Sequence, residues 1–248
     1  MEKLGHHISL DKNVFNTVVN YPKKTLQIFT GSPQSYNRSE KLAFASEASE
    51  YILKNNIHLY VHGSYVVNIS NKYEECEKAM QYLKRDLKLV HDISSKGLVI
   101  HVGKYKTSTE KEGIEVMFSN VSRILVETLN EASNGKFLLE TPAGQGSETL
   151  TKIEDFISFC KRFKDNKRFG LVIDTCHVFA SGYDPLFYLQ QIVENGLTVD
   201  LVHMNDSEKP KGSRVDRHAG IGHGLIGLEK LSECIKFCID NEIDMVNE

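Results

Sequence analysis

Residues 201–224 read Leu-Val-His-Met-Asn-Asp-Ser-Glu-Lys-Pro-Lys-Gly-Ser-Arg-Val-Asp-Arg-His-Ala-Gly-Ile-Gly-His-Gly. A short apolar run at residues 201–202 ends on His203, and the polar loop that follows presents Asp216 and His218 two positions apart. Imidazole and carboxylate groups are ligands that suit zinc or a similar divalent ion. One such triple arises easily by chance, so its meaning depends on whether other apolar runs end in the same way.

The other apolar runs of the chain repeat this ending. Short runs of strand-forming residues predict eight strands, at residues 4–9, 25–29, 57–61, 97–100, 137–139, 169–173, 201–202 and 244–246. The third to eighth strands are followed by His62, His101, Glu140, Asp174, His203 and Glu248. Any one of these residues is explained more simply as the start of a polar loop, but six in succession are not.

Helical spacing of apolar residues separates the predicted strands. It predicts helices at residues 13–19, 39–55, 73–91, 112–132, 151–163, 186–193 and 228–239. The stretch Thr151-Lys-Ile-Glu154 has the spacing of a capping box and opens the fifth of them. Strands that alternate with helices indicate a parallel sheet with crossover helices.

The length and the strand endings favour a closed barrel. Eight strands in 248 residues match an α/β fold of the TIM (β/α)₈ class. A doubly wound open sheet is the alternative, and periodicity alone leaves it open. In a barrel the carboxyl ends of all strands converge on one mouth, whereas an open sheet would spread the six polar residues along an edge. We therefore predict a single TIM-barrel domain over residues 1–248, with a ligand-lined mouth.

Composition limits the class of protein. A quarter of the residues are charged and the formal net charge is −3, so nothing global indicates a nucleic-acid partner. No apolar run approaches the ~20 residues of a membrane span, and no signal peptide opens the chain. The five cysteines are an odd number and lack a Cys-x-x-Cys pair. They predict reduced thiols in an intracellular protein of the cytoplasm or nucleus, or of a virion if the source is viral.

Nine ligand-type residues are too many for one tetrahedral zinc. His177, Asp216 and His218, which we expect on loops of the same face, join the six residues that end strands. Such a set suits two or three ions that share bridging carboxylates, and paired ions about 3.5–4 Å apart clamp the oxygens of a phosphoester. Three divalent ions outweigh the four carboxylates by about two charges, which favours an anionic phosphodiester as substrate.

Other polar residues are weaker candidates. Asp206 either orients a metal-binding histidine or belongs to a turn. His223 is expected to be a loop residue and His58 a packed strand residue, while Gly144-Gln-Gly146 is a short turn with only a weak phosphate-binding signal. The loop after His203 also carries four cations that could contact phosphates, although a basic loop is usually a solvated face: Lys209, Lys211, Arg214 and Arg217.

The motifs around these residues resemble the endonuclease IV family of apurinic/apyrimidinic (AP) endonucleases, also called AP endonuclease family 2. The matching segments run nearly end to end. They are residues 5–9 (GHHIS), 29–33 (FTGSP), 61–65 (VHGSY), 101–103 (HVG), 139–147 (LETPAGQGS), 173–184 (IDTCHVFASGYD), 203–207 (HMNDS) and 212–227 (GSRVDRHAGIGHGLIG).

The resemblance implies a xylose-isomerase-like TIM barrel with three zinc ions at its mouth; manganese is the alternative ion, since such ligands accept both. The implied ligands of the first ion are His62, His101 and Glu140. Glu140, the expected catalytic residue, would bridge to the second ion, which Asp174, His203 and Glu248 complete. The implied ligands of the third ion are His177, Asp216 and His218.

The resemblance also implies an activity in base-excision DNA repair. In the family a metal-bound hydroxide hydrolyses the phosphodiester 5′ to an abasic site in double-stranded DNA, leaving a 3′-hydroxyl and a 5′-deoxyribose phosphate. The family also cleans blocked 3′ ends, and its loops kink the duplex and flip the abasic nucleotide. We expect a monomer whose DNA contacts are His7, Gln34, Tyr65, Arg214 and Arg217.

The chain departs from the family pattern at three places. Gln34 stands where the family usually has an Arg that enters the DNA, and Val102 replaces a common Pro. The chain stops at Glu248, whereas the family continues into a final helix, so we expect a truncated sequence or a barrel closed by another chain. Two other functions remain alternatives: a metal-dependent sugar isomerase or epimerase, and a module that binds damaged DNA without cleaving it.

Overall fold

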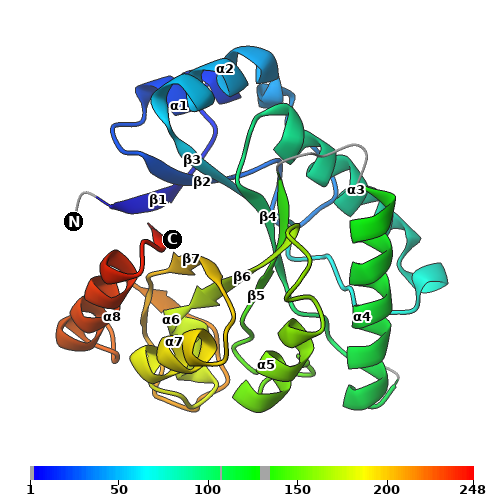
Figure 1. Ribbon diagram of the computed structural model, residues 1–248, viewed down its shortest axis with the longest axis vertical. Coiled ribbons are helices and arrows are strands. Elements are labelled where there is room, and N and C mark those ends of the chain that lie inside the picture. Colours follow the sequence, from blue (N-terminus) through cyan, green and yellow to red (C-terminus); the bar gives the residue numbers. More distant parts are fainter. Residues whose placement is uncertain (1–2, 107, 129–134) are drawn as a thin grey trace.

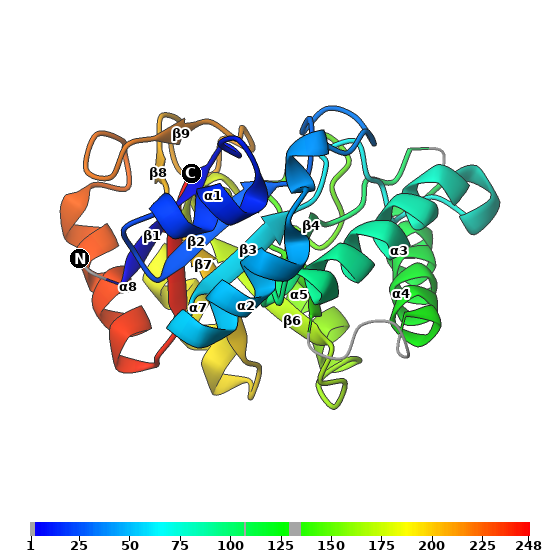
Figure 2. The ribbon, with the colours of Figure 1, turned by 90° about the horizontal axis from the view of Figure 1, so that it is seen from above.

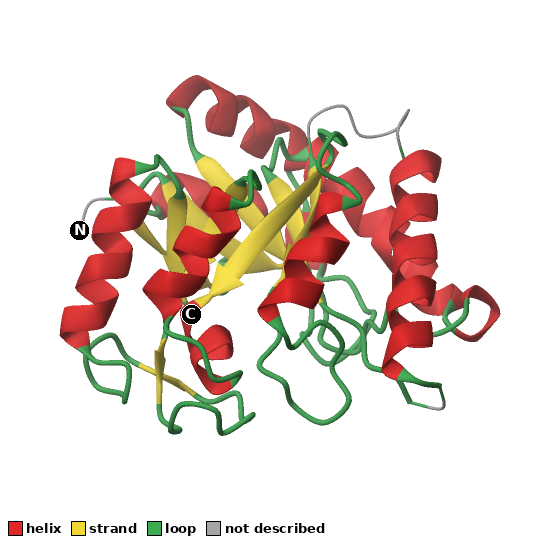
Figure 3. Ribbon diagram, turned by 60° about the horizontal axis from the view of Figure 1, so that its bottom comes forward, coloured by secondary structure: helices red, strands yellow, loops and turns green. Residues whose placement is uncertain are grey.

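The computed structural model describes residues 3–106, 108–128 and 135–248. Within them eight parallel strands form a closed barrel that helices surround (Figures 1 and 3). The barrel strands are β1 (Leu4–Ile8), β2 (Thr25–Phe29), β3 (His58–His62), β4 (Gly97–His101), β5 (Lys136–Glu140), β6 (Phe169–Asp174), β7 (Val199–His203) and β10 (Asp244–Asn247). Their order around the barrel is β1-β10-β7-β6-β5-β4-β3-β2. The predicted TIM barrel is therefore confirmed.

Helices follow most of the strands, as the alternation predicted. They are α1 (Val14–Asn20), α2 (Ala45–Asn55), α3 (Glu77–Asp92), α4 (Glu110–Glu127), α5 (Ile153–Lys161), α6 (Thr175–Ala180), α7 (Pro185–Glu194) and α8 (Leu228–Asp240). Two 3₁₀ turns, η1 (Glu40–Leu42) and η2 (Tyr73–Glu75), precede α2 and α3. Among the described residues no helix is long and apolar enough to cross a membrane.

The bore of the barrel is filled by one residue from each of six strands. They form an apolar cluster separate from the larger core between strands and helices: Tyr60, Val99, Leu138, Val172, Leu201 and Val246. Because side chains alternate along a strand, the residue two positions later also points into the bore, one layer nearer the carboxyl end. In all six strands that later residue is a predicted metal ligand, so the apolar layer supports the ligand layer directly.

The barrel closes within this chain. β10 pairs with β7 on one side and with β1 on the other, and Gly5 of β1 is opposite Val246. A side chain at Gly5 would not fit, since a Cβ atom there would lie 2.0 Å from the carbonyl oxygen of Thr25. The alternative that another chain closes the barrel is therefore wrong.

Two predicted helix starts are corrected. The predicted capping box at Thr151 is wrong, because α5 begins after Lys152, whose side chain makes no capping bond. A capping box instead opens α4, where Thr109 and Glu112 cap each other's backbone N–H groups.

The helix predicted over residues 39–55 is broken at Phe44, which has a φ of 66°. The last residues of the helix predicted over 112–132 lie outside the described residues.

Periodicity missed three short elements at the mouth. One is α6, which begins directly after β6 and is capped by Asp174. The others are β8 (Asp206–Ser207) and β9 (His218–Ala219), which pair as an antiparallel hairpin beside the C-terminus (Figure 2). They are too short to show a repeat in the sequence.

Asp206 anchors the loop that follows this hairpin. Its buried carboxylate accepts backbone N–H bonds of 2.8–3.3 Å from Ser207, Gly222, Gly224, Ile226 and Gly227. A Cβ atom at residue 224 would lie 2.5 Å from the same carboxylate, so glycine is required there. Asp206 therefore has neither role expected from the sequence. It does not orient a metal-binding histidine, and its backbone partners extend over a whole loop and not over a single turn.

The substitution Asp206→Ala tests this anchor. It leaves several amide groups without an acceptor, each costing about 1–3 kcal/mol where it stays buried. We expect faster cleavage by a protease within residues 208–227, measured by limited proteolysis and mass spectrometry. Glu208→Ala, at the exposed neighbouring position, is the matched control. Equal cleavage rates for the two variants would contradict the anchoring role.

Candidate metal centre

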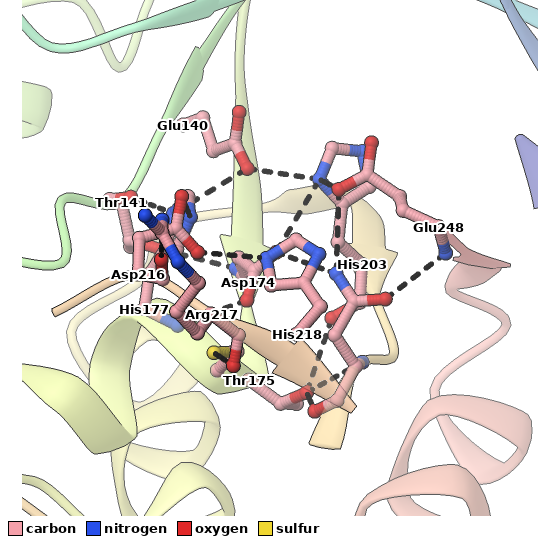
Figure 4. A network of polar contacts seen from close by, with 12 residues as sticks. Glu140, Thr141, Asp174, Thr175, His177, His203, Asp216, Arg217, His218 and Glu248 are labelled. Carbon is pink, nitrogen blue, oxygen red and sulfur yellow. Dashed lines mark hydrogen bonds and ion pairs between the residues drawn. The ribbon is translucent and has the colours of Figure 1, made fainter. Parts of the chain in front are cut away.

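Glu140 lies at the middle of the ligand layer. Its Oε2 atom is 3.0 Å from His101 Nε2 and 3.3 Å from His62 Nε2, and its Oε1 atom is 2.9 Å from His203 Nδ1. The residue is completely buried. The two oxygens of one carboxylate thus face different histidines, which is the arrangement expected of a carboxylate that bridges two ions. Figure 4 shows Glu140 with one carboxylate oxygen directed at His203.

A second group forms around His203. Its Nδ1 atom lies 3.3 Å from Glu248 Oε2 and 3.8 Å from Asp174 Oδ2. Asn205 donates a hydrogen bond of 2.8 Å to that Asp174 oxygen. Glu140, Asp174, His203 and Glu248 offer ligand atoms that all lie within 4.8 Å of one another. The structure therefore brings together the four residues predicted for the second ion.

The third predicted group also assembles, with one addition. Asp216 lies 3.3 Å from His177 Nε2 and 3.1 Å from His218 Nε2. Asp174 Oδ2 is 3.6 Å from His218 Nε2, and Asp174, His177 and His218 also form a compact ligand group. Asp174 therefore lies between the second and third groups, as Glu140 lies between the first and second. The expectation that His177 is on a loop is wrong, because it lies on α6.

The buried polar atoms of this centre fit a set of cations. Among the described residues, Glu140 Oε2 and His218 Nε2 are buried and make no hydrogen bond, although groups of opposite charge lie close to both. Buried polar atoms of native proteins almost always have a partner. Lone pairs that converge without hydrogen bonds are what divalent ions require, and the nine predicted donors are nitrogen and oxygen atoms, as zinc or manganese accepts. The Sγ atom of Cys176 also lies within 4.8 Å of ligand atoms of Asp216 and His218.

Backbone carbonyls orient two of the histidines. The Nδ1 atom of His62 is 2.7 Å from the carbonyl oxygen of Gly63, and that of His177 is 2.9 Å from the carbonyl oxygen of Thr141. A carbonyl only accepts, so each Nδ1 carries the proton and each Nε2 keeps its lone pair for the centre.

The acids and bases of the centre shift each other's pKa values. Burial alone would raise the pKa of Glu140, but the surrounding imidazoles hold it well below its usual range. Burial would lower the pKa of His203, but Glu248 and other carboxylates raise it to about 9. Burial would also lower the pKa of His218, but Asp174 raises it to about 9. Without metal, Glu140 is ionised and the imidazoles of His203 and His218 hold protons at neutral pH.

The predicted DNA contacts occupy two kinds of position. Tyr65 is 52% exposed, and its ring centre lies 5.3–5.5 Å from those of His62 and His101, so it forms part of the rim. Gln34, Arg214 and Arg217 are also exposed. The side chain of His7 is only 11% exposed and its Nδ1 is 3.1 Å from Glu248 Oε1, so it faces the ligand layer rather than an open loop.

Two other histidines discussed from the sequence lie apart from the predicted ligands. His223 is exposed, as expected for a loop residue. His58 lies at the opposite end of β3 from His62 and is 2.7 Å from Asp244 Oδ2. The five cysteines are buried and unpaired. Burial raises the pKa of Cys176 to about 12, so its thiol stays protonated beside the centre.

Sequence reasoning missed Gln27, a polar residue that contacts the ligand layer. It is completely buried on β2, donates a hydrogen bond of 2.7 Å to Glu248 Oε1, and lies 2.9 Å from His203 Nε2 through its Oε1 atom. The available signal was a single amide within the apolar run of residues 25–29. Asn205 was missed as well, although it immediately follows the His203-Met204 pair.

Loading with zinc should release protons. A neutral imidazole is the ligand, so the protons that the raised pKa values of His203 and His218 retain at pH 7.5 must leave. We expect apparent affinity to rise as the pH rises toward 9, and calorimetry in two buffers of different ionisation enthalpy to report the released protons. The same shifts stabilise the metal-free fold below pH 6.5, and this contribution is lost as the pH rises through about 9. Equal heats in both buffers would contradict this expectation.

Comparisons with known proteins identify the family of this chain. A family described as xylose isomerase-like TIM barrel matches residues 19–237. A probable endonuclease 4 of Mycoplasma capricolum subsp. capricolum is 32% identical over 246 residues, covering 92% of this chain and 83% of the relative. A probable endonuclease 4 of Sulfurihydrogenibium sp. is 34% identical over 247 residues, covering 92% of this chain and 86% of the relative.

Solved structures distinguish a likeness to the endonuclease IV family from a likeness to the barrel fold alone. Endonuclease IV from Thermus thermophilus has a TM-score of 0.84 at 27% identity, covering 99% of this chain and 91% of that one. A D-tagatose 3-epimerase-like protein has a TM-score of 0.75 at 16% identity, covering 98% of this chain and 89% of that one. At that identity the second likeness shows the barrel fold alone.

Proposed function

We propose, from the premise that this chain belongs to the endonuclease IV family of DNA-cleaving hydrolases, that it incises double-stranded DNA. The incision would occur on the 5′ side of abasic sites, with zinc as the cofactor. The products would be a 3′-hydroxyl and a 5′-deoxyribose phosphate, and blocked 3′ ends would be a further substrate. We further propose that residues 1–248 act as one domain, as a monomer, in a compartment that keeps the cysteines reduced.

Two buried carboxylates support the proposal most directly. Glu140 lies between the first and second ligand groups, and Asp174 between the second and third. Three adjoining groups linked by two carboxylates suit an anionic substrate whose charge increases in the transition state. When bound, the ions would supply Lewis-acid stabilisation of the charge that develops on the phosphate oxygens.

The chain itself would hold and orient the phosphate at the rim. Burial raises the pKa of Tyr65, and Glu248 and Glu140 raise it further, so the hydroxyl keeps its proton and can donate to a phosphate oxygen. His7 and the buried candidate ligands lie beneath this rim, where water has little access. Fixed hydrogen-bond donors in such a place act on charge more strongly than they would in water.

The mouth also offers room and positive charge for a duplex. A cavity of about 630 Å³ lies beside His7 and is lined by the loops after β1 and β2, including Phe29, Arg38 and Lys41. Four exposed cations of the loop before β9 add charge on the other side: Lys209, Lys211, Arg214 and Arg217. Binding through phosphates should weaken with salt. An abasic nucleotide has no base to unstack, so its extrusion into the mouth would cost less than that of an intact nucleotide.

Neither alternative function explains the whole centre. A sugar isomerase or epimerase would need about four ligands and would leave the group of His177, Asp216 and His218 without a role. A module that only recognises damaged DNA would have no use for two buried carboxylates shared among three ligand groups. Hydrolysis uses all nine residues.

An incision assay tests the proposed reaction. The protein is dialysed against a strong chelator, and a labelled duplex with one abasic site is added before and after zinc is restored. We expect a single nick 5′ to the site only after zinc, with a 3′-hydroxyl that a polymerase extends. The same duplex without the abasic site is the control. A folded, zinc-loaded protein that binds the duplex without nicking it would favour the recognition module.

Glu140→Gln tests the bridging carboxylate. The substitution keeps the size of the side chain but removes the charge that faces the histidines, so we expect incision to fall by more than about 100-fold. Glu154→Gln, at an exposed position of α5, is the matched control and should keep full activity. Activity of Glu140→Gln within tenfold of the unchanged protein, at saturating zinc, would exclude a bridging role.

A further inference from the structure

We propose that Gln27 is a positioning residue that selects the tautomer of His203 and turns Glu248 toward the metal centre; this rests on the proposed metal-dependent function. Nothing in the sequence motifs assigns Gln27 a role. Both ends of its amide are engaged by candidate ligands, the nitrogen by Glu248 and the oxygen by His203. Its effect would therefore be exerted through its two neighbours.

The barrel register places Gln27 among the residues of the bore. It is opposite His7 on β1 and Tyr60 on β3. Tyr60 belongs to the apolar layer that fills the bore beneath the ligands, so Gln27 occupies on β2 the position that apolar side chains occupy on six other strands. A buried amide there is unfavourable unless its donors and acceptor are satisfied. All of them are.

The direction of each hydrogen bond follows from the orientation of the Gln27 amide. Its nitrogen, which only donates, lies 2.7 Å from Glu248 Oε1 and 3.0 Å from His7 Nδ1. Its oxygen faces His203 Nε2, at 2.9 Å. Since an amide oxygen only accepts, His203 Nε2 carries a proton.

This proton decides which nitrogen of His203 can bind a metal. With Nε2 protonated, the neutral ring has its lone pair on Nδ1. That atom faces Glu140, Asp174 and Glu248 at 2.9, 3.8 and 3.3 Å. The opposite tautomer would point an N–H group at the same carboxylates and leave no lone pair for an ion. Gln27 therefore acts on His203 as backbone carbonyls act on His62 and His177.

The second contact orients Glu248. Gln27 holds its Oε1 atom on the side of β2, which leaves Oε2 directed at His203 Nδ1. The other hydrogen of the Gln27 amide lies toward His7 Nδ1, at 3.0 Å. Three strands, β1, β2 and β7, are thus tied to the residue that follows β10. A hydrogen-bond partner of a metal ligand typically changes metal affinity by about 10–100-fold.

Gln27→Met is the variant that tests this role. Methionine has a similar length and fills the same space but neither donates nor accepts as an amide does. We expect one equivalent of zinc to bind about 10–100-fold more weakly, measured by competition with a chromophoric chelator, while the remaining equivalents keep their affinity. In the cobalt-loaded protein the visible absorption bands should shift, because the ligand field at His203 changes.

Ile28→Val is the matched control. It alters packing at the adjacent buried position of the same strand, whose side chain faces the outer core. We expect this variant to change the melting temperature without changing zinc affinity or the cobalt spectrum. Zinc affinity and cobalt spectrum unchanged in Gln27→Met would overturn the proposal. So would equal losses of affinity in both variants, since they would reflect packing alone.

A measurement on the unchanged protein keeps the proposal testable if Gln27→Met does not fold. In the zinc-loaded protein with ¹⁵N-labelled histidine, NMR should show the His203 Nε2 nitrogen protonated and Nδ1 unprotonated. The opposite tautomer would overturn the proposal. Neither readout depends on DNA cleavage: zinc binding and tautomer as expected without incision would refute the proposed function and leave the role of Gln27 intact.

Discussion

The alternation of side chains in a closed parallel barrel is the constraint on which the metal centre depends. All eight strands present their carboxyl ends at one mouth, and each side chain that enters the bore is followed two positions later by another that enters it. Six apolar residues fill the bore and six candidate ligands lie directly above them. Five of these candidates end barrel strands and Glu248 directly follows β10, so all six rest on a packed layer.

The remaining ligands depend on features that the barrel does not supply. Asp174 is both the N-cap of α6 and a ligand: its Oδ1 atom accepts from the backbone of His177, and its Oδ2 atom faces His203 and His218. One carboxylate thus sets the position of the helix that carries the next ligand. Asp206 fixes the loop beyond the β8–β9 hairpin through five backbone contacts.

The opposite end of the bore is also polar, and it joins strands that are not neighbours. His58 and Tyr60 of β3 both lie 2.7 Å from one oxygen of Asp244 on β10, although β2 and β1 lie between these strands in the barrel. Four residues further along the same strands come His62 and Glu248.

The sequence by itself determined the fold class and a set of candidate ligands, because each depends on a local pattern. A strand shows as an apolar run, and a candidate ligand shows as a histidine or carboxylate where the run ends; His101 and Glu140 were selected in this way. The first ligand group follows from those two facts and from the geometry of a barrel. Helical spacing of apolar residues also correctly predicted the long helices α3 and α4.

Only the tertiary structure decided which of these residues contact and orient one another. Gln27 and His203 are 176 positions apart, and nothing in either local stretch indicates that one would set the tautomer of the other. The position of Asp174 between two groups, the anchoring by Asp206 and the choice of Thr109 over Thr151 as a cap likewise depend on neighbours brought together by folding. The direction of a hydrogen bond depends on which two polar groups meet in space. The amino-acid sequence alone does not show which groups meet.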